Sequence, residues 1–201
     1  MVWTYRGRAI PLDVYHGVPK GWYANQIIAE HAQLRGTFIL SGPEATEPGA
    51  PSWMPERHAW LQYRQALYRL ADGILADDAA CAELAIRYIE LRHIGSYSGF
   101  IRSLLARRLK HVSLSTDQKA RLHHHFAELV KNDERTEEFR DFVKLWRRVA
   151  TDDELETLAR ALRAKPNGEA RVQQLMELLR PNPAFNTDAR GRGFAPPSRA
   201  G

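Results

Sequence analysis

Large hydrophobic residues recur at intervals of three and four positions along most of the chain after residue 55. Within residues 56–76, the positions Trp60, Tyr63, Leu67, Leu70 and Ile74 follow this spacing, which places them on one face of a helix. The same periodicity continues to about residue 180. It predicts seven helices, over about residues 56–76, 78–94, 97–111, 115–131, 134–149, 151–164 and 169–180.

Polar residues that cap helices mark several of these boundaries. Ser115 and Thr151 are each followed three residues later by Gln or Glu, which is the spacing of a capping box. Asp77 or Asp78 is expected to cap the second helix, and Gly95 to end it. Short connections predict a mainly α fold, either a multi-helix bundle or a HEAT-like array of helical hairpins, with about seven helices. The hairpins of such an array would span residues 56–94, 97–131 and 134–164.

The chain before residue 56 has a different pattern. Residues 1–18 carry hydrophobic residues in short pieces broken by Gly and Pro, which predicts an irregular arm or a β-hairpin. A helix is expected over 21–34 and a short β-rich piece over 37–40, before a loop with four prolines. We therefore divide the chain into an N-terminal arm, helix and linker (1–55), a helical domain (56–180) and a flexible basic tail (181–201).

Composition indicates a globular protein of the cytoplasm. Hydrophobic residues make up 44% and charged residues 26% of the 201 positions, which is ordinary for a globular domain. The single cysteine, Cys81, cannot form an internal disulfide, and this fits a reducing compartment. The N-terminus has no apolar run of signal-peptide length, and no segment has the roughly 18 apolar residues of a membrane span.

Positive charge is concentrated in residues 85–111, which carry six basic side chains and one acidic one. Their local charge equals the net charge of the whole chain, +5, and such a patch is typical of contact with a polyanion or an acidic partner. On a helical wheel, Arg102, Arg107 and Lys110 fall on the polar half of the predicted helix over 97–112. Arg108 falls in the apolar half, so its guanidinium should extend past its apolar neighbours to water, pair with a buried carboxylate of a neighbouring helix, or mark a helix that has already ended. We favour the ion pair or the helix end.

A second basic group lies on the helix over residues 134–149. Arg140, Lys144 and Arg147 share a narrow arc opposite the apolar face, an arrangement that suits phosphate contacts. The helix dipole offers another reason for cations near the end of a helix that begins with Glu. Arg190 and Arg192 of the tail are further candidates for nucleic-acid contact.

Motifs for catalysis are weak. Three consecutive histidines, residues 123–125, point 100° apart on a helix and cannot converge on one metal ion. Arg87 and His93 have the spacing of the Arg and His pair in HEPN-type ribonucleases, but several such pairs are expected by chance in this composition. No Gly-rich phosphate loop, GxSxG, HExxH or CxxC occurs. We therefore expect no catalytic residue, no metal and no cofactor.

Three hypotheses about function remain. The first is a noncatalytic helical protein that contacts nucleic acid or a nucleoprotein partner through a basic helical face. The second is a protein–protein adaptor or inhibitor module that uses the helical array and the aromatic N-terminal arm. The third is a HEPN-like or metal-dependent nuclease. The first hypothesis depends on whether the two basic helices share one face, which the sequence does not determine.

Overall fold

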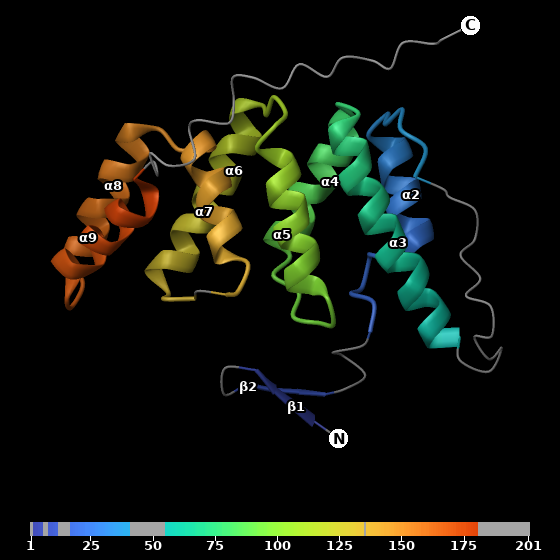
Figure 1. Cartoon of the computed structure of the whole chain (residues 1–201), viewed down its shortest axis with the longest axis horizontal. Helices are drawn as coiled ribbons and strands as arrows, with labels where there is room; N and C mark the ends of the chain where they lie inside the picture. The colour runs from blue at the N-terminus through green and yellow to red at the C-terminus, as the bar shows by residue number, and fades with distance from the viewer. Residues whose placement is uncertain (1, 6–7, 12–16, 41–54, 135, 181–201) are drawn as a thin grey trace, which may run out of the picture.

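The computed structural model describes residues 2–5, 8–11, 17–40, 55–134 and 136–180 (Figure 1). Within these residues the chain forms eight α-helices and one pair of short strands, so the prediction of a mainly α fold is confirmed. No described helix combines the length and the apolar character needed to cross a membrane. The helices are α2 (Ala24–Gln33), α3 (Pro55–Leu75), α4 (Ala79–Glu90), α5 (Ser98–Leu109), α6 (Thr116–Lys131), α7 (Phe139–Val149), α8 (Asp152–Arg163) and α9 (Gly168–Leu179).

The helices form two layers of stacked hairpins. In one layer α3, α5, α7 and α9 pack in order, and in the other α2, α4, α6 and α8 do so. Figure 1 shows this order along the long axis of the molecule. Consecutive helices pack on each other in the pairs α2–α3, α3–α4, α4–α5, α6–α7 and α8–α9, whereas α5 does not pack on α6, nor α7 on α8. The predicted pair over 56–94, α3 and α4, is therefore formed. The predicted pairs over 97–131 (α5 and α6) and 134–164 (α7 and α8) are therefore wrong, because α5 pairs with α4 and α7 pairs with α6.

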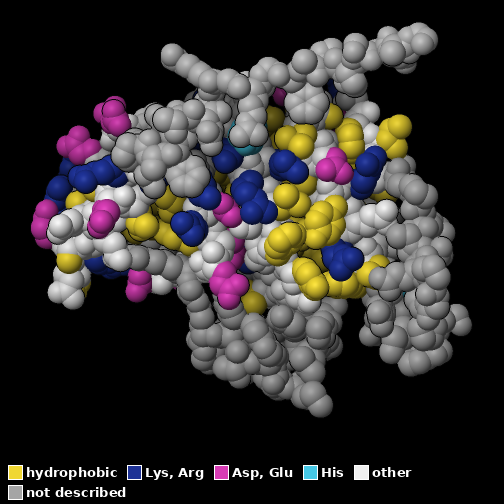
Figure 2. Space-filling model, viewed as in Figure 1, with side chains coloured by type: hydrophobic (Ala, Val, Ile, Leu, Met, Phe, Trp, Pro, Cys, Tyr) yellow, Lys and Arg dark blue, Asp and Glu magenta, His cyan; other side chains and the backbone are white. Residues whose placement is uncertain are grey.

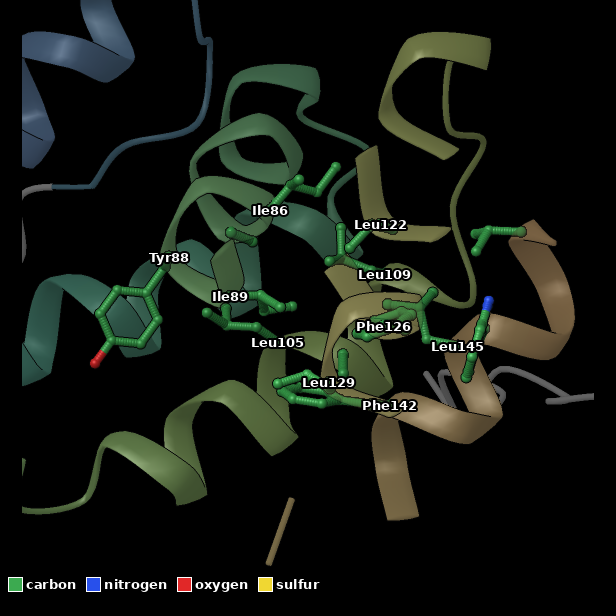
Figure 3. Packing of buried hydrophobic residues seen from close by; sticks show 14 of the residues in the cluster. Ile86, Tyr88, Ile89, Leu105, Leu109, Leu122, Phe126, Leu129, Phe142 and Leu145 are labelled. Carbon is green, nitrogen blue, oxygen red and sulfur yellow. The ribbon is translucent and has the colours of Figure 1, made fainter. Parts of the chain in front are cut away.

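One continuous hydrophobic core lies between the layers. It extends from Ile27 of α2 to Leu179 of α9 and includes the predicted stripe of α3, in which only Trp60 is half-buried. Figure 3 shows its centre, where Phe126 of α6 lies beside Phe142 of α7 with 5.1 Å between ring centroids. Because α2 also packs on α3 and α4, it shares this core with the helices after residue 55.

Most predicted helix starts are confirmed. The hydroxyls of Ser115 and Thr151 accept hydrogen bonds from backbone N–H groups three residues later, at 3.2 and 3.3 Å. Asp78 caps α4 by accepting from the N–H of Cys81 at 2.7 Å. Gly95, in contrast, does not end α4, which stops at Glu90 before a left-handed residue, Arg92 (φ 54°).

Outside the array of helices, the structure agrees with one prediction, for the N-terminal arm, and differs from another, for residues 37–40. Strands β1 (Val2–Tyr5) and β2 (Arg8–Pro11) pair antiparallel, so the described backbone takes the hairpin form of the two arm alternatives. Residues 37–40 are not a strand. Instead, the N–H groups of Thr37 and Phe38 donate to the carboxylate of Asp78 at 2.6 and 2.9 Å, which ties this segment to the start of α4.

Candidate nucleic-acid interface

The two basic helices, α5 and α7, lie side by side and run in the same direction. Near the start of both helices Arg102 contacts Glu138, and further along Ser103 donates to Asp141 at 2.6 Å. At the far end, residues of both helices line one cavity. The cations of α5 and α7 therefore have access to a common face.

Arg102 does not belong to that face, contrary to our prediction. Its side chain is only 7% exposed, and its Nε donates to Oε1 of Glu138 at 2.7 Å. Its remaining nitrogens donate to the same carboxylate and to the backbone carbonyl of His93. Because α5 packs against α3, α4 and α7, its buried positions are not confined to one narrow stripe and include Arg102. The helix is turned so that Phe100 is 52% exposed while Arg102 faces inward.

Arg108 neither forms an ion pair with a described residue nor marks the end of the helix. The helix continues to Leu109, so its end does not explain the position of Arg108. The side chain is half-buried, and its Nε is buried without a hydrogen-bond partner in the described part of the chain. The buried ion pair that we expected for Arg108 is formed by Arg102 instead.

Arg107 and Lys144 do lie on the common face, on either side of Asp141. Arg107 approaches one carboxylate oxygen of Asp141 at 3.8 Å, and Lys144 donates to the other at 3.0 Å. Burial alone would raise the pKa of Asp141, but the hydrogen bonds from Ser103 and Lys144 and the charge of Arg107 lower it. The carboxylate therefore stays ionised and partly neutralises the two cations.

The solvent side of α7 carries the other cations of this face. Arg140, Arg147 and Arg148 are exposed, and Arg147 donates to the backbone carbonyl of Leu178 in α9. Figure 2 shows Lys and Arg side chains gathered over the middle of the array, next to hydrophobic side chains. Arg190 and Arg192 lie outside the described residues. We define the basic face as Arg107, Arg140, Lys144, Arg147 and Arg148.

A cavity of about 210 Å³ lies at the end of this face. Three cations line it: Lys110 follows α5, Lys119 lies in the first turn of α6, and Arg148 lies in the last turn of α7. Sequence reasoning did not select Lys119, because only the fold brings the start of α6 to the ends of α5 and α7. We call this cavity the basic cup; its other lining residues are Leu109, Val112, Ser113, Leu114, Leu145 and Val149.

Other cations of residues 85–111 are already paired. Arg87 donates to Glu83 at 2.8 Å and to Glu30 of α2 at 2.6 Å. Arg92 pairs with Glu134. Together with the burial of Arg102, these pairs remove half of the six basic side chains of the segment from the candidate surface.

The structure also brings together three groups that could hold a metal ion, a cluster that the sequence did not suggest. His31, Asp78 and Cys81 are buried with their donor atoms within 4.8 Å of one another. However, the two oxygens of Asp78 already accept five hydrogen bonds, three of them from backbone N–H groups. Burial, followed by the charge of Asp78, raises the pKa of Cys81, so the thiol keeps its proton. This donor set fits a structural staple between α2, residues 37–38 and α4 better than a metal site.

The three consecutive histidines of α6 lie in different environments. His125 is buried, His124 is exposed, and Nδ1 of His123 accepts a hydrogen bond from the indole of Trp146 at 3.1 Å. Burial and the charge of Arg102 lower the pKa of His93 to about 4. His93 thus lies beside Arg102, while Arg87 is held by two glutamates, so their different surroundings give no support to a HEPN-like pair.

Comparison with protein-family models, with curated proteins and with solved structures finds no match to this chain. Its function must therefore be argued from the geometry of the basic face and the basic cup.

Proposed function

We propose that this protein is a noncatalytic helical-array protein that binds nucleic acid through the basic face. The observation that carries the proposal is the parallel packing of α5 and α7, which places the exposed cations of two helices on one side. Cations on such a face bind by neutralising backbone phosphates, which gives affinity with little reading of bases.

The charge balance of the face supports a polyanion as the ligand. Arg107 and Lys144 share one carboxylate, Asp141, so the five cations of the basic face together with this carboxylate carry about four positive charges. Arg140 and Arg148 make no ion pair with any described residue. Along α7, Arg140 and Arg147 are separated by about 10 Å at 1.5 Å per residue, which is about three nucleotides at 3.4 Å per step.

Salt-dependent binding to single-stranded RNA tests the proposal. Fluorescence anisotropy with a labelled oligonucleotide should show binding at about 50 mM salt that weakens steeply at about 200 mM. The variant Arg140→Gln/Lys144→Gln should bind more weakly and reduce the slope of log K against log salt by about 1.4, since each lost phosphate contact contributes about 0.7. The matched control is Lys20→Gln/Arg160→Gln, which removes one exposed Lys and one exposed Arg elsewhere. Absence of binding at low salt, or equal losses in both variants, would refute the proposal.

A protein partner is the second candidate, because aromatic side chains are exposed on the same layer. Tyr97 and Phe100 are each more than half exposed, and their rings lie near Trp60 and Tyr68 of α3. Arg64 covers the rings of Trp60 and Tyr97 at 5.1 and 5.6 Å from their centroids. Exposed aromatics next to Arg are typical anchors of protein interfaces.

Photo-crosslinking tests whether a protein partner docks at Phe100. A benzoyl-phenylalanine at position 100 should form a defined protein adduct in cells, while the same group at Met176, which is also exposed on α9, should not. Equal labelling at both positions would contradict a docking site at Phe100.

A further inference from the structure

The helix dipole accounts for some of the positive charge of the basic cup but not for all three cations. Lys110 and Arg148 lie at the C-terminal ends of α5 and α7, where the helix dipole favours cations. Lys119 lies in the first turn of α6, where the dipole disfavours a cation. Two helix C-termini carry about −0.5 charge each, so the three cations outweigh them by about two charges.

Within the described part of the chain, these cations also have no acidic partner. No carboxylate lines the basic cup, and Lys110, Lys119 and Arg148 form no ion pair with any described residue. Lys110 and Arg148 lie close enough to His111 to affect its pKa. Partial burial lowers this pKa, and the charges of Lys110, Arg148 and Arg108 lower it further. The backbone carbonyls at the end of α5 do not offset this charge fully, because those of Ala106, Arg108 and Leu109 accept N–H groups of residues 110–112.

We propose that the basic cup binds a phosphomonoester group. A dianion matches the excess of about two positive charges better than the single charge of a backbone diester. The cavity of about 210 Å³ has room for several water molecules at about 30 Å³ each, so a phosphate group fits within it. Arg148 can offer two parallel N–H donors to the phosphate, and the lysines act as point charges. The proposal rests on the proposed function, because the cup continues the basic face and a strand end would bring its terminal phosphate there.

Titration with inorganic phosphate tests the cup by itself. In heteronuclear NMR spectra of the full chain at constant ionic strength, phosphate should produce saturable shifts at residues 110–119 and at Arg148. Chloride at matched ionic strength should not produce them. The cup variant Lys110→Gln/Lys119→Gln, which leaves every residue of the basic face in place, should lose this saturable response, whereas Lys20→Gln/Arg160→Gln should retain it. An unchanged response in the cup variant, or none in the wild type, would overturn the proposal.

Oligonucleotides then identify the source of the phosphate. A single-stranded RNA with a 5′- or a 3′-phosphate should bind about tenfold more tightly than the same RNA with hydroxyl ends. The cup variant should lose this preference and still bind both forms through the basic face. If RNAs with phosphate and hydroxyl ends bind equally well while inorganic phosphate still gives its saturable shifts, the strand end is not the ligand of the cup. AMP would then be titrated as a free phosphomonoester. If no oligonucleotide binds while phosphate and AMP do, the proposed function fails and the cup remains a site for a free phosphomonoester.

Discussion

Replacing Glu138 with Gln should lower the free energy of unfolding more than the same replacement at any exposed Glu. Arg102 and Glu138 are 7% and 3% exposed at their side chains, and two guanidinium nitrogens donate to one carboxylate oxygen. Glu138→Gln leaves the guanidinium buried without a counter-charge. Removing one partner of a buried pair costs about 3–5 kcal/mol of the free energy of unfolding. For a chain of this size, that corresponds to a decrease in Tm of roughly 6–20 °C.

Urea denaturation followed by far-UV circular dichroism measures this loss. The matched control is Glu156→Gln, because Glu156 and its partner Arg160 are both 72% exposed and 3.7 Å apart on α8. An exposed pair contributes little, so the control should not change the midpoint measurably. Replacing both buried partners, Arg102→Met/Glu138→Met, should be less destabilising than either single replacement, because no buried charge is left unpaired.

Equal midpoints for Glu138→Gln and Glu156→Gln would refute the reasoning. That result would mean that Arg102 reaches water, and Arg102 would then return to the basic face as a phosphate contact. The same experiment therefore decides between a structural and a binding role for this residue.

Three further predictions concern the buried groups. Asp78→Ala should lower the free energy of unfolding by about 3 kcal/mol, because it removes a helix cap and leaves buried N–H groups unpaired; Asp77→Asn, at an exposed left-handed position, is the control in the same urea titration. His93 and His125 each have a folded-state pKa of about 4 against an ordinary 6.5. The unfolded chain thus binds more protons between these values, and the unfolding free energy should fall by up to about 3 kcal/mol for each of the two histidines as pH drops from 6.5 to 4; equal urea midpoints at pH 7 and 5 would contradict this. Gly73→Ala should cost about 1–3 kcal/mol in thermal unfolding, because its Cβ would overlap the buried thiol of α4.

The local features of the fold could be predicted because they depend on short-range chemistry. The stripe of α3 and the caps at Ser115 and Thr151 follow from residues three and four positions apart. Gly95 was misleading because Arg92 takes the left-handed conformation first, an arrangement that composition does not indicate. The pairing of helices was predicted correctly for 56–94 but not for 97–131 and 134–164, since neither helical period nor loop length says which neighbour a helix covers.

The candidate site was predicted in part. Arg107, Arg140, Lys144 and Arg147 are exposed, as their positions on the helical wheels indicate. Arg102 was misplaced because a wheel assumes one buried face, whereas α5 is packed by three helices. Arg108, which the wheel places in the apolar half, is half-buried. Lys119 was missed because it lies on a different helix from the charge cluster.

The sequence by itself determined that this chain is helical, where most helices begin, and that positive charge is concentrated in two helices. These properties depend on hydrophobic periodicity, on capping and on composition, which act over a few residues. Only the tertiary structure decided which charges remain available for a ligand. Burial with Glu138 removes Arg102, pairing with Asp141 moderates Arg107 and Lys144, and the meeting of three helix ends creates the basic cup. Electrostatic interactions depend on distance and burial in space, and both are properties of the folded array.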